Sequence, residues 1–241
     1  MPSFNIMISY IKNKIRNGIR QAAFSHTDRD QALHMAWGHI FNNRLRGDYW
    51  EFGVYKGDSM LMSWKEYQKF KSWNESQLKS NEPWRVKLAM DYSSYEPKFI
   101  GFDTFLGLPE NSEQNPIFDE GNFAASLESV ESRLGKVINK NSLKLVEGDF
   151  TKSYVSPSNS PIAILYIDSD LYESALAALK LSKLYLQIGS VILFDEFHGF
   201  NADDFKGERR ALSEFLESNS IKMDRWFDYH YGGRAFLVTQ L

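Results

Sequence analysis

The chain has 241 residues, of which 43% are hydrophobic and 24% charged, and its formal net charge at pH 7 is −3. These ordinary values exclude an intrinsically disordered chain, a collagen and a coiled coil, and the small acidic charge gives no reason to expect a nucleic-acid partner. The absence of cysteine excludes disulfides, thiol nucleophiles, thiolate zinc sites and iron–sulfur clusters.

The start of the chain, residues 4–20, has the periodicity of a helix, because Ile8, Ile11, Ile15 and Ile19 fall on one face. Its basic side chains would let it lie on a membrane surface. Stable attachment needs a second anchor, so we favour packing on the body of the protein or on a second subunit. No apolar run approaches the ~18 residues that span a bilayer, and no secretory signal is apparent. We therefore expect a cytoplasmic protein without an integral membrane segment.

Further along, helices and strands alternate. In chain order, the first half is predicted to contain a helix over 30–46 capped by Asp28 or Asp30, a strand over 48–55 ending in a glycine turn, a helix over 59–79, an irregular stretch over 80–97, a strand over 99–103 and a loop over 107–121. The second half is predicted to contain a helix over 123–134, a strand over 143–147, a loop over 153–161, a strand over 162–167, a helix over 171–187, a strand over 190–194, a helix over 208–217 and strands over 222–228 and 234–239.

The alternation of elements predicts an α/β fold with a mainly parallel sheet. The apolar run at 162–167 is typical of a strand buried on both faces, and residues 162–194 form a βαβ crossover pattern. We expect one domain over residues 47–241. It is preceded by an N-terminal helical extension over residues 1–46, which we expect to be a lid or an oligomer contact.

Acidic residues follow nearly every predicted strand. They are Glu51 in the first turn, Asp103, Asp149, Asp168 with Asp170, and Asp195 with Glu196; His198 comes shortly afterwards. In an open parallel sheet, ligands bind outside the carboxyl ends of the strands. Carboxylates are costly to gather without compensating charge, so their convergence favours a cationic ligand or a metal ion. Any single one of them could instead be a helix cap or a solvated turn.

The first of these turns, Glu51-x-Gly53-x-x-x-Gly57, differs from both familiar phosphate-binding patterns. A dinucleotide fold would have G-x-G-x-x-G, and the P-loop pattern is absent. A turn headed by an acid fits a ligand that has positive groups and no phosphates. S-adenosylmethionine is such a ligand, with an amino group, a sulfonium, a ribose diol and an adenine.

The acids after two later strands could form a metal site. Asp168 and Asp195 follow strands joined by a single crossover, so the strand ends lie about 5 Å apart if the strands pair. With Glu196, they could bind one hard divalent cation, for which octahedral Mg²⁺ is the natural choice. We expect Asp170 to cap the next helix instead, because Asp170 and Glu173 have the spacing of a capping box.

Several sequence blocks together point to one known family. They are Glu51-Phe-Gly-Val-Tyr-Lys-Gly57, Gly101-Phe-Asp-Thr-Phe-Leu-Gly-Leu-Pro109, Glu147-Gly-Asp-Phe150, Tyr166-Ile-Asp-Ser-Asp-Leu-Tyr-Glu-Ser174, Phe194-Asp-Glu-Phe197 and Gly207-Glu-Arg-Arg-Ala-Leu-Ser-Glu-Phe215. In this order they resemble the macrocin O-methyltransferase (TylF-like) family of class I S-adenosylmethionine-dependent enzymes, over about residues 48–239. The resemblance implies a Rossmann-like, seven-stranded sheet with the last strand antiparallel, a divalent metal that is usually Mg²⁺, and methylation of a sugar hydroxyl.

The same resemblance assigns roles by position. Gly53, Tyr55 and Gly57 match the methionine end of the cofactor site, Asp103 the ribose contact, Asp149 and Phe150 the adenine end, and Asp168, Asp195 and Glu196 the metal ligands. Glu51, Ser59, Thr104 and Asp168 are further candidate cofactor contacts. The family usually has a second Asp at position 196, so whether Glu196 ligates directly or through water stays open. Residues near 70–97 are expected to be an insertion that shapes the substrate site.

We expect the metal-bound acceptor hydroxyl to lose its proton to Asp168 or His198 and to attack the methyl group. A turn histidine on the surface is an equally good interpretation of His198.

The partners we expect are a sugar-containing small molecule and further copies of the chain. Three alternatives stay open: methylation of a phenolic or polyketide diol, a nicotinamide-dependent oxidoreductase, and a non-catalytic protein with a relic cofactor site. The turn at 51–57 lacks the third glycine of the dinucleotide-binding pattern, and many acidic residues gather at the strand ends. Both features argue against the oxidoreductase.

Overall fold

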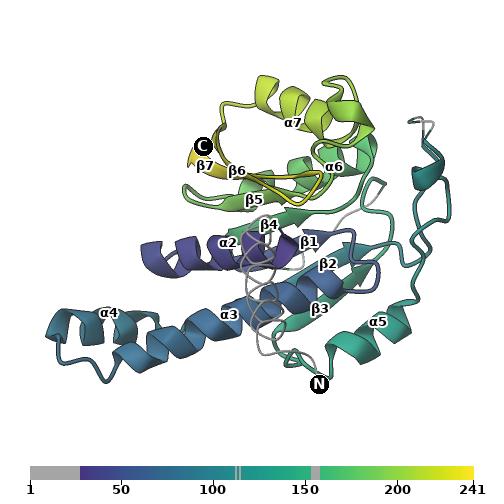
Figure 1. Cartoon of the computed structure of the whole chain (residues 1–241). Coiled ribbons are helices and arrows are strands. Elements are labelled where there is room, and N and C mark those ends of the chain that lie inside the picture. The colour runs from purple at the N-terminus through teal and green to yellow at the C-terminus, as the bar shows by residue number, and fades with distance from the viewer. Residues whose placement is uncertain (1–27, 112, 114, 153–157) are drawn as a thin grey trace, which may run out of the picture.

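A seven-stranded sheet lies at the centre of the protein in the computed structural model, which describes residues 28–111, 113, 115–152 and 158–241 (Figure 1). The strand order is β3-β2-β1-β4-β5-β7-β6. The strands are β1 (Asp48–Phe52), β2 (Phe99–Asp103), β3 (Leu143–Glu147), β4 (Ile162–Ile167), β5 (Val191–Phe194), β6 (Lys222–Tyr229) and β7 (Gly233–Gln240). The first five pair in parallel, whereas β7 is antiparallel to both β5 and β6. The α/β fold with an antiparallel last strand is therefore confirmed.

Helices cover both faces of this sheet. They are α2 (Arg29–Asn43), α3 (Asp58–Gln77), α4 (Pro83–Ser93), α5 (Leu127–Leu134), α6 (Tyr172–Ser182) and α7 (Gly207–Glu217), with short 3₁₀ turns η2 (Pro116–Phe118), η3 (Lys183–Tyr185) and η4 (Phe200–Ala202). One hydrophobic core joins α2, α3 and α5 to the sheet, and the other joins α6 and α7 to its opposite face. None of the described helices is long and apolar enough to cross a bilayer.

The central strands are apolar on both sides because both faces are covered. Every residue of β1, β4 and β5 is buried. In the register of the sheet, Phe52 pairs with Ile167, and Ile167 pairs with Phe194. The three strands thus end level with one another, and Gly53, Asp168 and Asp195 leave the sheet at one edge.

Most predicted elements are present, and the strands over 99–103, 143–147 and 162–167 have the predicted bounds. The helix predicted from residue 123 begins at Leu127 instead, because the side chain of Ser126 caps it by accepting a hydrogen bond from the Ser129 amide. The helix predicted over 171–187 ends at Ser182 and continues as η3. The helix predicted over 4–20 lies outside the described residues.

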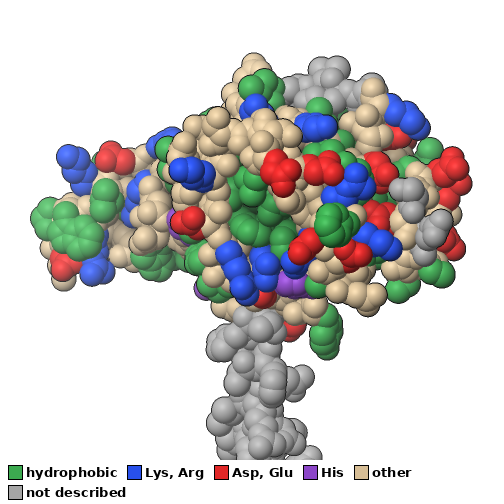
Figure 2. Space-filling model, turned by 90° about the horizontal axis from the view of Figure 1, so that it is seen from above, with side chains coloured by type: hydrophobic (Ala, Val, Ile, Leu, Met, Phe, Trp, Pro, Cys, Tyr) green, Lys and Arg blue, Asp and Glu red, His purple; other side chains and the backbone are tan. Residues whose placement is uncertain are grey.

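The prediction of an irregular stretch over 80–97 was wrong, because these residues contain α4. Pro83 is compatible with this helix because it occupies the first turn, where the amide has no helical partner. Only Ala89 and Tyr92 of α4 are buried, so the segment has no clear apolar face in the sequence. α4 and the C-terminal end of α3 form an arm that extends away from the sheet, and Figure 2 shows hydrophobic side chains gathered at its far end. Exposed Leu78 and Trp84 belong to this arm.

Candidate active site

A cavity of about 450 Å³ lies beyond the carboxyl ends of the parallel strands. One end is lined by Asp149, Phe150 and Thr151 after β3, and the other by Arg29 and Glu196. Between them the wall is formed by residues that follow β2, β1 and β4. The cavity therefore crosses the sheet edge where the sequence predicted a ligand site, and its volume is typical of small-molecule sites.

The turn after β1 requires glycine at its first position. Gly53 has φ +88°, and a Cβ added there would lie 1.8 Å from the carbonyl oxygen of Asp168. The turn is held from the side by Asp103. Its Oδ2 accepts hydrogen bonds from the amides of Val54 and Tyr55, each at 2.8 Å, and its Oδ1 accepts one from Phe105 at 2.7 Å. Since a carboxylate has about four acceptor positions, about one remains for a ligand.

Glu51 is completely buried and is absent from the cavity wall. It accepts hydrogen bonds from the hydroxyls of Tyr49 and Ser59, the second at 2.7 Å. Burial raises the pKa of Glu51 to about 8. The structure thus places Glu51 behind the turn, where it orients Ser59. The side chain of Ser59 does line the cavity, as do Gly53, Tyr55 and Thr104. Gly57 caps α3 at φ +79°.

The far end of the cavity follows β3. Asp149 accepts hydrogen bonds from the amide and the hydroxyl of Thr151, and it forms an ion pair with Lys152 at 2.9 Å. Burial works to raise the pKa of Asp149, but these donors lower it below its usual value. The ring of Phe150 packs edge-on against Phe52, with 5.0 Å between ring centroids. This end has an anionic group next to an aromatic surface.

Three carboxylates at the other end have no hydrogen-bond partner within the described part of the chain. Asp168, Asp170 and Glu196 are half-buried and line the same cavity. Burial, reinforced by Asp195, raises the pKa of Asp168 and of Glu196. Burial and the Glu196 charge raise the pKa of Asp170 to about 8. This end of the cavity is short of positive charge.

The capping role predicted for Asp170 was wrong. α6 begins after Leu171, which makes no side-chain cap, and Asp170 has a left-handed backbone with φ +59°. That turn directs Asp170 into the cavity wall rather than along the helix. A capping box needs an extended residue directly before the helix, so the added residue moves Asp170 out of that position.

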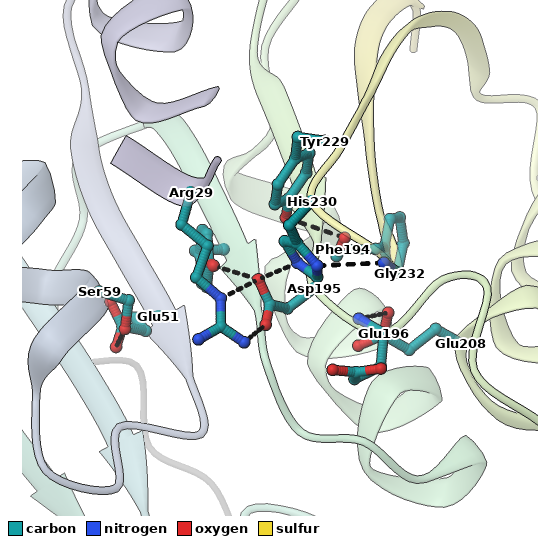
Figure 3. Close-up of polar contacts among 11 residues, drawn as sticks. Arg29, Glu51, Ser59, Phe194, Asp195, Glu196, Glu208, Tyr229, His230 and Gly232 are labelled. Carbon is teal, nitrogen blue, oxygen red and sulfur yellow. Dashed lines mark hydrogen bonds and ion pairs between the residues drawn. The ribbon is translucent and has the colours of Figure 1, made fainter. Parts of the chain in front are cut away.

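Asp195 is surrounded by donors (Figure 3). Its Oδ1 accepts hydrogen bonds from Nε of Arg29 at 2.9 Å, from the Tyr166 hydroxyl and from Nε2 of His230 at 3.0 Å, and its Oδ2 accepts one from Nη2 of Arg29. Burial works to raise the pKa of Asp195, but the bonds from His230 and Arg29 lower it below its usual value.

The sequence did not predict Arg29, Tyr166 or His230 as neighbours of Asp195. Arg29 is 166 positions away in the chain, and nothing in its surroundings distinguishes it from other arginines. Glu208 was missed as well. It is 1% exposed, its Oε2 accepts the Glu196 amide at 3.0 Å, and its Oε1 has no partner among the described residues. The only signal for Glu208 was its place in one of the family-like blocks.

His198 lies apart from the first cavity. Its Nε2 is 3.7 Å from Asp228, and it lines a second cavity of about 840 Å³ together with Lys65 and His230. Partial burial, with Arg234 nearby, lowers the pKa of His198. Arg29 and Glu196 line both cavities, so the two meet at these residues.

The donor chemistry suits a hard cation, because Asp168, Asp170 and Glu196 offer carboxylate oxygens that nothing else engages. Across the residues that the structure describes, however, no three Asp, Glu or His side chains converge on one point as ligands of a metal ion would. At Asp195, the guanidinium of Arg29 engages both carboxylate oxygens.

A family profile described as macrocin O-methyltransferase (TylF) matches residues 90–227, more than half of the chain. The chain belongs to this family. It is therefore an S-adenosylmethionine-dependent O-methyltransferase. No curated protein sequence matches it significantly.

Solved structures share the fold of this O-methyltransferase. The O-methyltransferase NovP is 17% identical with a TM-score of 0.67, over 88% of this chain and 80% of NovP. The calicheamicin methyltransferase CalS11 is 22% identical with a TM-score of 0.59, over 86% and 77% of the two chains. An O-methyltransferase from Bacillus cereus in complex with SAH is 11% identical with a TM-score of 0.51, over 95% and 90%.

Proposed function

We propose that this O-methyltransferase transfers the methyl group to a hydroxyl of a sugar, carried by a nucleotide sugar, a glycosylated natural product or a polysaccharide precursor. The observation that supports this most is the second cavity of about 840 Å³, which meets the first at Arg29 and Glu196. Its size suits an acceptor larger than a single sugar ring. CalS11, which shares the fold, is described as a TDP-rhamnose 3'-O-methyltransferase, which supports this class of acceptor.

The cofactor would occupy the first cavity. We assign its methionine end to the turn of Gly53, Tyr55 and Gly57, supported by Ser59 and, from behind, by Glu51. Its ribose lies at Asp103 and Thr104, and its adenine at Asp149 and Phe150. In the sheet, β2 and β3 lie on one side of β1, and β4 and β5 lie on the other. A cofactor whose adenine and ribose lie beyond β3 and β2 therefore directs its methyl group toward Asp168, after β4, and toward the second cavity.

Asp168, Asp195 and Glu196 are the residues that would hold a divalent cation, Mg²⁺ first, with Asp170 beside them. A bound divalent cation would make the acceptor hydroxyl more acidic. The support is the unpartnered state of three of these four carboxylates and the raised pKa values at Asp168, Asp170 and Glu196. Both indicate that the described residues supply too little positive charge to hold all of these groups as carboxylates.

Asp168 is the residue we propose as base. Its carboxylate lines the cofactor cavity, and no described residue donates a hydrogen bond to it, so it is free to accept a proton. The acceptor oxygen attacks the methyl carbon, the carbon–sulfur bond breaks, S-adenosylhomocysteine leaves and the proton goes to the carboxylate. His198 is a second candidate for the base, because it lines the cavity proposed for the acceptor.

That the protein forms a homo-oligomer and that it is located in the cytoplasm stay predictions.

The test is methyl transfer to a panel of acceptors, measured as release of S-adenosylhomocysteine. The panel contains nucleotide sugars, glycosides and catechol. We expect turnover of a sugar acceptor, and Asp168→Asn should lower kcat by roughly 10²–10⁴-fold, the usual loss of a general base. Turnover of catechol without any sugar acceptor would contradict the proposed substrate class. Full activity of Asp168→Asn would contradict the base.

A further inference from the structure

Arg29 and Asp195 form an ion pair between residues that are 166 positions apart in the chain. Arg29 is the first residue of α2, and its guanidinium binds both oxygens of Asp195 at the end of β5. The side chain of Arg29 is 43% exposed, whereas that of Asp195 is fully buried. Figure 3 shows the guanidinium reaching to the carboxylate from the side opposite His230. The pair is therefore open to solvent only on the arginine side.

The four hydrogen bonds to Asp195 are divided unevenly between its two oxygens. Oδ1 accepts three, from Arg29, Tyr166 and His230, and Oδ2 accepts one, from Arg29. Since each carboxylate oxygen has about two acceptor positions, the position that is left belongs to Oδ2, the oxygen that the guanidinium also engages. A divalent cation that ligates Oδ2 would therefore lie against the positive charge of Arg29.

Of the three donors, Arg29 is the one that would leave. Tyr166 is fully buried, and the side chain of His230 is only 14% exposed. Arg29 borders the second cavity and has a route to water, and its fixed positive charge repels a divalent cation at the same carboxylate. Tyr166 and His230 carry no such fixed charge.

We propose that Arg29 and a divalent cation are mutually exclusive partners of Asp195. Arg29 neutralises this buried carboxylate while no cation is bound, and it withdraws toward the second cavity when a cation binds. This inference rests on the metal use proposed above. It makes Arg29 a positioning residue that lowers the affinity of the site for the cation.

The experiment measures Mn²⁺ binding by the full chain with S-adenosylhomocysteine present, using the electron paramagnetic resonance signal of free Mn²⁺. Arg29→Gln removes the charge and the two-point contact. Lys65→Gln is the matched control, because Lys65 lines the second cavity but makes no contact with Asp195. We expect Arg29→Gln to bind Mn²⁺ at least about 5-fold tighter, the lower end of ordinary coupling between two ligands, and Lys65→Gln to bind as the wild type does.

A second readout needs no variant. The Nε–H resonance of Arg29 in the wild type should shift when diamagnetic Mg²⁺ is added, since the ion pair to Asp195 breaks. Equal or weaker Mn²⁺ binding by Arg29→Gln, or an unmoved Arg29 resonance under Mg²⁺ saturation, would overturn the competition.

A third result would contradict both the competition between Arg29 and a cation for Asp195 and the use of a divalent cation, but not the methyl transfer. If neither protein binds Mn²⁺ while both bind S-adenosylhomocysteine and turn over in the presence of a chelator, Arg29 is the permanent cation of the site. Loss of S-adenosylhomocysteine binding in the wild type would instead contradict the cofactor assignment itself.

Discussion

Asp103 lines the cavity proposed for the cofactor and also holds the turn after β1. The family resemblance implied a ribose contact at this residue, which stays a prediction. The structure adds that its carboxylate accepts hydrogen bonds from the amides of Val54 and Tyr55. This second role could not be predicted, because it depends on β1 and β2 being neighbours with a particular register.

Asp103→Asn should weaken binding of S-adenosylhomocysteine. The amide replaces one carboxylate oxygen by a donor, which faces backbone amides and loses charge-assisted hydrogen bonds of about 1.5–3 kcal/mol each. The expected dissociation constant is at least about 10-fold higher, since 1.4 kcal/mol corresponds to a factor of 10. Isothermal titration calorimetry measures it, and an unchanged dissociation constant would show that Asp103 neither holds the turn nor contacts the ribose.

Gly53→Ala should destabilise the fold more than a matched glycine substitution. The new Cβ would lie 1.8 Å from the carbonyl oxygen of Asp168 at φ +88°. We expect a loss of about 2–6 kcal/mol from backbone strain and overpacking together. Gly121→Ala is the control, because Gly121 has φ +82° with nothing within 4 Å, so only the backbone strain remains. Thermal unfolding compares them, and equal melting temperatures would contradict the close approach of β1 and β4.

At the scale of elements, the strands were predicted better than their connections. The runs 99–103 and 162–167 are nearly continuous apolar stretches because both faces of the sheet are covered there, and this is visible in the sequence. The edge strand over 143–147 mixes apolar and charged residues, and none of them is fully buried. The connection from β4 to α6 was misjudged, because the left-handed turn at Asp170 has no local sequence signal. α4 was missed for a different reason, since a helix with two buried residues lacks an apolar period.

The connection from β4 to α6 should make stability depend on pH. The folded protein holds the pKa of Asp170 at about 8, well above the usual value near 4 of an unfolded chain. Between these values the folded state binds more protons than the unfolded state, so this group makes stability fall as the pH rises. Asp170→Asn should raise the melting temperature at pH 8 and change it little at pH 4.

The matched control for this prediction is Asp119→Asn, because Asp119 is exposed. It should leave the melting temperature unchanged at both pH values. If Asp170→Asn lowers the melting temperature at pH 8, then Asp170 is charged and compensated in the fold, and the shortage of positive charge at this end of the cavity does not exist.

At the scale of the whole molecule, the sequence predicted which residues gather at the sheet edge but not what balances them. The order of strands brings Gly53, Asp103, Asp149, Asp168 and Asp195 to one side, as parallel strands require. Arg29, Tyr166 and His230 reach Asp195 from three other parts of the fold. Long-range pairs of this kind depend on packing, which a single sequence does not reveal.

We propose that the cavity at this edge holds S-adenosylmethionine in this O-methyltransferase of the macrocin family. Calorimetric titration of the full chain with S-adenosylhomocysteine measures this binding without an acceptor. We expect one site per chain with a dissociation constant in the micromolar range or below, weakened by Asp103→Asn. No heat of binding and no protection against thermal unfolding by S-adenosylhomocysteine, with or without Mg²⁺, would contradict it.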